Sequence, residues 1–121
     1  MKANLAPFIV EGILIIVSAI LGLSLGKAGK PYGKVKLVLH LFFFAWLTMG
    51  FAFIFPATIA AMSPELIPVA LMGLALLTLL VVGIMMIASK SVKKTLQSVH
   101  KAAAIVMLLS DIAALVITAV H

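Results

Sequence analysis

Hydrophobic residues dominate four long stretches of the chain, and short polar segments separate these stretches. The pattern predicts helices over about residues 7–26, 35–61, 67–89 and 95–120. Each stretch is long enough to cross a hydrocarbon core, which needs roughly 20 apolar residues. We therefore predict an all-α membrane protein, in which residues 1–121 form one four-helix transmembrane domain with an up-down bundle.

Proline and glycine positions predict where these helices begin and end. Pro7 fits the first turn of the first helix, and the glycines and proline within 26–31 end that helix. Pro56 is expected to distort the last turns of the second helix, which Ser63 and Pro64 close.

The composition supports a membrane protein and limits its chemistry. Hydrophobic residues make up 65% of the chain, charged residues make up 10%, and the mean hydropathy is +1.37. The chain has no cysteine, which excludes disulfides, bound iron–sulfur clusters and covalent c-type haem. Lys2 is the only basic residue before a first stretch of spanning length, so we expect this helix to be retained rather than cleaved as a signal.

The lysines predict the orientation of the bundle. Eight of the nine lysines lie in or beside the two loops that join the first helix to the second and the third to the fourth, namely Lys27, Lys30, Lys34, Lys36, Lys90, Lys93, Lys94 and Lys101. The positive-inside rule places these loops in the cytoplasm and both termini on the outer side. We expect a prokaryotic cytoplasmic (inner) membrane. The net charge of +6 then requires no nucleic-acid partner.

Two histidines occupy matching positions, because His40 and His100 each lie one to two turns into an apolar stretch that follows a basic loop. The helical rise places both at about 6 to 8 Å below the cytoplasmic interface. The segments from Gly22 to His40 and from Gly83 to His100 are nearly equal in length, which indicates a repeated helical hairpin. Two such hairpins would bring the histidines face to face on diagonal helices. An imidazole is costly in hydrocarbon, so the pair indicates a shared ligand.

The neighbours of the histidines on the same helix faces favour a haem. Ala103 and Ala104 leave room beneath His100 for the edge of a porphyrin, and Phe44 lies beneath His40. Four nearby lysines are expected to meet the haem propionates: Lys36, Lys93, Lys94 and Lys101. A bis-histidine iron has no open coordination position, which favours electron transfer. The alternative is that each histidine binds a headgroup, water or carbonyl near the interface.

The segments KVKLVLHLFFFAW and KKTLQSVHKAAAIVMLLSD resemble the histidine-bearing helices of small membrane-bound b-type cytochromes. The resemblance covers the second and fourth predicted helices. It implies a four-helix bundle, one non-covalent haem b ligated by His40 and His100, and electron exchange with quinone or a partner redox subunit. Larger members of this class commonly place two histidines on one helix and hold two haems, whereas this chain offers one clear pair.

Glu11 and Asp111 are the acidic residues within the predicted spans. A carboxyl group in lipid is either protonated or paired, so both side chains are expected to point into the bundle or, for Glu11, towards another subunit. Asp111 lies about 16 Å along the helix from His100, on the same face. We predict a proton or quinone site at these two acids. The alternative is a structural hydrogen bond, for instance to Thr48, Thr118 or a partner chain.

His121 ends the fourth predicted helix, about 30 Å along the axis from His100, so it cannot bind the same iron. We expect it to be interfacial or exposed, with a role as an outer-side ligand as the alternative.

Together these features predict a b-type cytochrome subunit that transfers electrons between the quinone pool and a partner redox protein. Such a chain would work as an electron-transfer protein or within an oxidoreductase complex, rather than as a stand-alone enzyme. A redox partner subunit or a homodimer is expected.

Two alternative functions stay open. One is a non-redox structural subunit of a larger membrane complex. The other is a small proton-coupled exporter that uses Glu11, because the early carboxylate in a four-span chain resembles the small multidrug resistance transporters.

Overall fold

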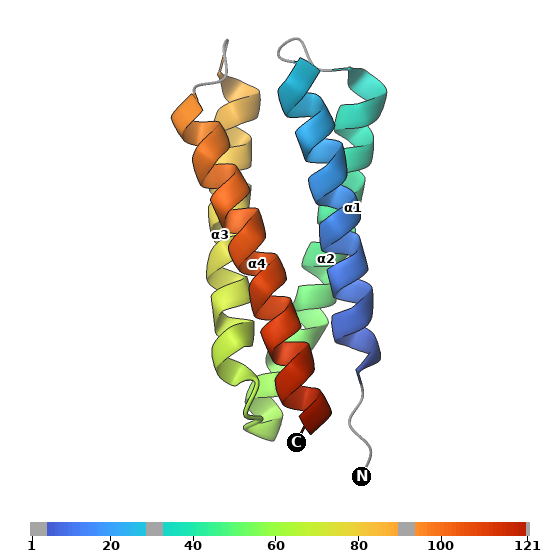
Figure 1. Cartoon of the computed structure of the whole chain (residues 1–121), viewed down its shortest axis with the longest axis vertical. Helices are drawn as coiled ribbons and strands as arrows, with labels where there is room; N and C mark the ends of the chain where they lie inside the picture. The colour runs from blue at the N-terminus through green and yellow to red at the C-terminus, as the bar shows by residue number, and fades with distance from the viewer. Residues whose placement is uncertain (1–4, 29–32, 90–93, 121) are drawn as a thin grey trace.

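The computed structural model describes residues 5–28, 33–89 and 94–120, which form four long α-helices and the turn between the second and third (Figure 1). The helices are α1 (Ala6–Ala28), α2 (Lys34–Ala61), α3 (Leu66–Ala88) and α4 (Lys94–Val120). Each predicted boundary lies within two residues of the observed one, and the described part of the chain contains no strand.

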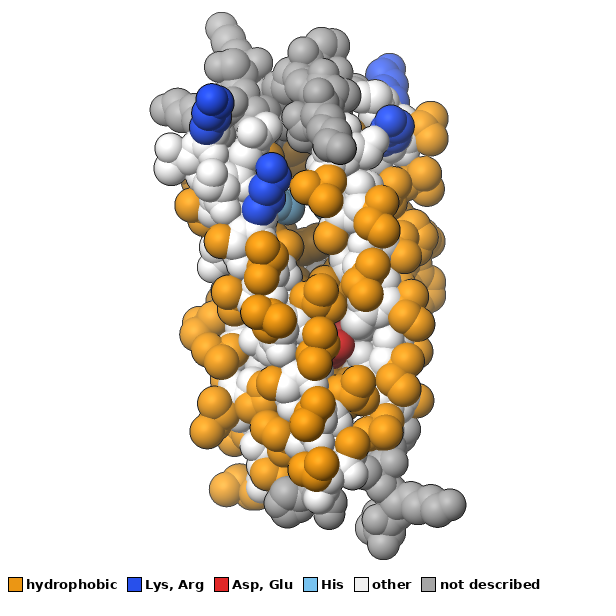
Figure 2. Space-filling view, in the orientation of Figure 1, with side chains coloured by type: hydrophobic (Ala, Val, Ile, Leu, Met, Phe, Trp, Pro, Cys, Tyr) orange, Lys and Arg blue, Asp and Glu red, His pale blue; other side chains and the backbone are white. Residues whose placement is uncertain are grey.

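All four helices are long and apolar enough to cross a membrane. Hydrophobic side chains cover the middle of the face shown in Figure 2, and the exposed ones include Ile13, Phe53 and Leu74. A soluble monomer rarely exposes so much continuous apolar surface, whereas a bilayer provides the matching solvent. These properties indicate an integral membrane protein.

The bundle consists of two helical hairpins. α1 packs against α2 and α4, and α3 packs against α4 and α2, whereas among the described residues the backbones of α1 and α3, and those of α2 and α4, do not approach each other closely. These last two pairs are therefore diagonal. The contacts are most extensive within the pairs α1–α2 (the first hairpin) and α3–α4 (the second hairpin).

The two ends of the bundle differ (Figure 1). At the loop end, where α1 and α3 finish and α2 and α4 begin, the hairpins stand apart. At the terminal end, where α1 begins and α4 finishes, they converge. The predicted four-helix bundle is confirmed.

The turn between α2 and α3 forms at the predicted place. Met62 follows α2 in the left-handed conformation, with φ 51° and ψ 40°. Its N–H donates to the carbonyl of Ile59, and the N–H of Ser63 donates to the carbonyl of Thr58. This pair of bonds is a Schellman motif, which satisfies two carbonyls at the helix end. α2 continues through Pro56 to reach it.

Two groups of buried apolar side chains fill the bundle. The central cluster contains Ile15, Leu47, Met72, Ala75, Leu76, Leu79, Ala103 and Met107. The terminal cluster contains Phe8, Ile54, Val69 and Ala114. Two ionisable side chains, Glu11 and Asp111, are also buried.

Candidate functional site

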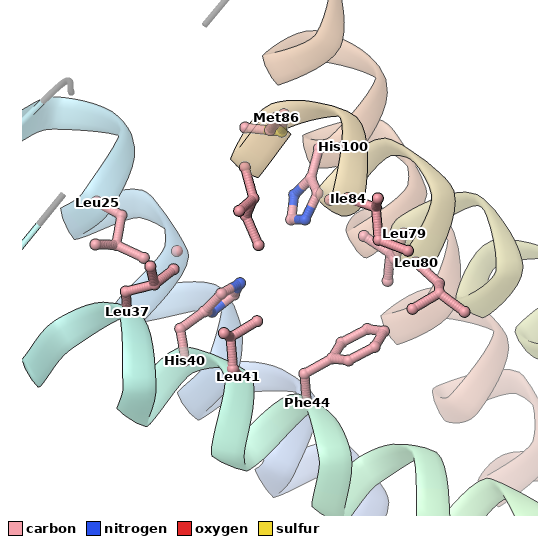
Figure 3. Close-up of a pocket in the computed structure, with 13 residues that line it drawn as sticks. Leu25, Leu37, His40, Leu41, Phe44, Leu79, Leu80, Ile84, Met86 and His100 are labelled. Carbon is pink, nitrogen blue, oxygen red and sulfur yellow. The ribbon is translucent and has the colours of Figure 1, made fainter. Parts of the chain in front are cut away.

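His40 and His100 face each other between the two hairpins. They project from the diagonal helices α2 and α4, and their ring centroids lie 6.2 Å apart with an angle of 47° between the ring planes. Both residues are partly buried, and Figure 3 shows the rings extending towards one another from opposite walls of a pocket. The structure thus brings together the two histidines that the sequence pairs.

The ring of His40 is oriented by Ser18 on α1. Its Nδ1 lies 2.8 Å from the backbone carbonyl oxygen of Ser18 and 3.3 Å from the hydroxyl. A carbonyl can only accept a hydrogen bond, so Nδ1 carries the hydrogen and donates it, and the lone pair resides on Nε2. A histidine that binds a metal commonly donates its second N–H to a backbone carbonyl. His40 therefore has the tautomer and the support that a metal ligand needs.

Gly22 allows α1 to approach this ring closely. A Cβ atom at Gly22 would lie 3.0 Å from Cε1 of His40 and 3.5 Å from its Nδ1. Any side chain at this position would press on the imidazole. The first hairpin thus positions His40 from two sides, through Ser18 and Gly22.

Two cavities adjoin the histidine pair. One, of about 130 Å³, lies between the first hairpin and α3, and the other, of about 210 Å³, lies between α1 and α4. Four residues line both cavities: Gly22, His40, Met86 and His100. The two cavities thus adjoin the same residues, and we call them together the interhairpin cleft. Its other walls are mainly apolar, and leucines and Phe44 surround the first cavity (Figure 3).

Of the residues predicted to contact a porphyrin beside the histidines, some line the cleft and one lies in the core. Phe44 lines the first cavity, and Ala104 lines the second beside His100. Ala103 instead packs within the central cluster and does not line either cavity. One of the two alanines therefore borders the cleft.

The predicted lysines also take different positions. Lys101 lines the second cavity. Lys36 donates a hydrogen bond of 2.9 Å to the hydroxyl of Ser24 on α1, and Lys94 is exposed in the first turn of α4. Figure 2 shows a lysine beside the opening in which histidine surface is visible. Lys30, Lys90, Lys93 and His121 lie outside the described residues.

Glu11 and Asp111 form a second polar centre nearer the terminal end. Their side chains are 1% and 2% exposed, on the neighbouring helices α1 and α4, and the two groups interact electrostatically. Both carboxyl oxygens of Glu11 and Oδ1 of Asp111 are buried without a hydrogen-bond partner among the described residues.

The two threonines considered as hydrogen-bond partners for the acids do not fill this role. The hydroxyl of Thr48 donates to the carbonyl of Phe44 at 2.7 Å. The hydroxyl of Thr118 is buried and has no partner of its own among the described residues. Neither threonine therefore satisfies the buried carboxyl oxygens of the two acids.

Asp111 lies against Gly12, the residue that follows Glu11, so the two acids are close together, and this proximity was not predicted. A signal was present, because Glu11 lies eleven residues before Gly22, and Asp111 lies eleven residues after His100. Gly22 and His100 both border the cleft, and α1 and α4 run in opposite directions. Equal spacing from a common level brings the two acids to the same depth.

Within the described residues, no group of three or more metal-ligating side chains is found. Comparison with protein family models finds no match, and comparisons with curated proteins and with solved structures find no similar protein.

Proposed function

We propose that this chain is a membrane-embedded b-type cytochrome subunit that holds one haem b between His40 and His100 and transfers electrons. The observation that carries the proposal is the facing pair of imidazoles on diagonal helices, with ring centroids 6.2 Å apart. The resemblance of the α2 and α4 sequences to those of small b-type cytochromes supports the same assignment.

The separation of the rings suits one metal ion between them. Two metal–nitrogen bonds of about 2 Å, together with the distances from the nitrogens to the ring centroids, require roughly 6 Å between centroids. His40 already presents the free lone pair of Nε2.

The donor set favours a macrocycle over a bare metal ion. Two histidines cannot complete a tetrahedral or octahedral site, and the described residues place no third ligating side chain with them. A porphyrin supplies four nitrogens of its own and needs two axial ligands. The cleft is apolar and borders the histidines on both sides, as a flat hydrophobic ring requires.

Charge at the loop end would fix the orientation of the ring. Lys101 lines the second cavity and can pair with a propionate. Lys36 and Lys94 are exposed at the same end of the bundle and add positive potential there.

When bound, haem b would supply one-electron chemistry. His40 and His100 would hold the haem, and the apolar walls of the interhairpin cleft would exclude water from it. These properties suit electron transfer between the quinone pool and a partner redox protein.

Optical spectroscopy tests this proposal. Purified protein reconstituted with haem b should give reduced-minus-oxidised b-type bands, and His40→Ala and His100→Ala should each remove most of their intensity. The third histidine provides the control, because His121→Ala should retain the bands. Circular dichroism checks that each variant is helical. Full-strength bands in both cleft variants, or folded wild-type protein that binds no haem, would overturn the proposal.

A further inference from the structure

The carboxyl groups of Glu11 and Asp111 occupy spaces that two glycines leave open. A Cβ atom at Gly50 on α2 would lie 2.7 Å from Oε1 of Glu11, and one at Gly12 on α1 would lie 2.8 Å from Oδ2 of Asp111. Each carboxyl group therefore rests against the backbone of a neighbouring helix. Three of their oxygens are buried and lack a hydrogen-bond donor.

Among the described residues, the ionisable groups of the four helices provide no cation for these acids. α3 carries none between Leu66 and Ala88. Those of the other helices whose side chains are described lie towards the loop end: Lys34, Lys36, His40, Lys94, His100 and Lys101. Side chains of the central cluster, including Ile15, Leu47 and Met107, lie between the histidines and the acids along their helices. The acids are thus one electrostatic unit in an apolar surrounding.

Two negative charges in this position would be strongly unfavourable. Like charges repel each other strongly in a low-dielectric interior, and a buried carboxylate without donors loses its solvation. A proton removes one charge and adds one O–H donor, which can satisfy an oxygen of the pair. Protonation therefore relieves the repulsion between the two carboxylates and supplies a donor for a hydrogen bond between them.

We propose that Glu11 and Asp111 form a proton-binding site in the core of the bundle, which holds at least one exchangeable proton at neutral pH. A metal cation would need several further oxygen ligands, and the described residues place no third acid or histidine beside the pair. A quinone ring would need an opening, whereas both carboxyl groups are almost fully covered. The proton is the ligand that fits the enclosed space.

Infrared spectroscopy tests this inference without any cofactor. The protein is purified at pH 7 in dodecyl maltoside, a detergent without carbonyl groups, and the carbonyl stretch of protonated carboxyl groups is measured in H₂O and after exchange into D₂O. The chain has three acidic residues, so assignment is direct. We expect a protonated-carboxyl band that shifts in D₂O, weakens in Glu11→Gln and in Asp111→Asn, and disappears in the double variant.

Glu65 provides the matched control, because it lies outside the helices in the α2–α3 turn, and Glu65→Gln should leave the band unchanged. The inference is overturned if wild-type protein shows no such band, if the band does not shift after a day in D₂O, or if it survives in the double variant. The wild-type spectra decide the matter even if a variant fails to fold. Haem binding is measured separately, so either proposal can fail alone.

Discussion

Three glycines on α1 and α2 each face an ionisable side chain from a neighbouring helix. They are Gly12, Gly22 and Gly50, and a Cβ atom on each would lie 3.0 Å or less from Asp111, His40 and Glu11 respectively. Small residues allow close approach of helices in membranes. Here they also provide the room that polar groups need inside an apolar bundle.

Gly50→Ala should destabilise the bundle, because its new methyl group meets a buried carboxyl oxygen. We expect the free energy of unfolding to fall by about 1 to 3 kcal/mol, which is the usual cost of overpacking a core. Gly83→Ala is the control, since no atom lies within 4 Å of its added Cβ, and it should be neutral or stabilising. Reversible unfolding in mixed detergent micelles measures the free energy of unfolding of each variant. Equal stability of the two variants would show that Glu11 is not confined as described.

At the scale of whole helices, the end of α2 depends on a residue poorly suited to its conformation. Met62 adopts a positive φ that costs an L-residue about 1 kcal/mol and costs glycine little. Its side chain is 80% exposed, so packing does not compensate. The Schellman motif sets this conformation through the backbone bonds of Met62 and Ser63.

Met62→Gly should therefore stabilise the protein by about 0.5 to 1 kcal/mol. Met49→Gly provides the comparison within the same helix, because Met49 is also exposed but lies in the helix interior, where glycine costs about 1 kcal/mol. Thermal unfolding followed by circular dichroism should show a higher Tm for Met62→Gly and a lower Tm for Met49→Gly. A destabilised Met62→Gly variant would mean that the turn gains from the methionine side chain.

The helices themselves could be predicted because each one is a long apolar run that ends at glycine, proline or charge. Their faces were harder to predict, since a helix that is apolar on all sides has no hydrophobic periodicity to show which side is buried. Polar residues gave the only orientation signal. The interior orientation of four polar residues could therefore be predicted, namely His40, His100, Glu11 and Asp111.

Features of the candidate site that depend on backbone contacts could not be predicted from the identities of the side chains. The carbonyl of Ser18 that holds His40 has no sequence signature, because every residue carries one. Ala103 and Ala104 both follow His100 by about one turn, and only the packing of α4 places one in the core and the other beside the cleft.

At the scale of the whole molecule, the lysines of the described residues gather at the loop end, as Figure 2 shows. Anionic headgroups and the positive-inside rule favour the cytoplasm for such an end. This orientation would place the interhairpin cleft nearer the cytoplasmic face and the acid pair nearer the opposite face.

Reporter fusions in a bacterial host check this orientation. Alkaline phosphatase, which is active only outside the cytoplasm, should be active when fused after residue 121 and inactive when fused after residue 91. A green fluorescent protein fusion should give the reverse pattern. The opposite result at both positions would invert the molecule in the membrane and place the cleft at the outer face.

The division of the histidines between two hairpins would also determine when a shared cofactor can bind during synthesis of the chain. A nascent chain that has inserted only α1 and α2 carries His40 with its Ser18 support but lacks the opposing imidazole of α4. A cofactor that requires both ligands can be captured firmly only after translation has delivered the last quarter of the polypeptide. Cofactor loading would then mark completed chains, and truncated products would remain colourless.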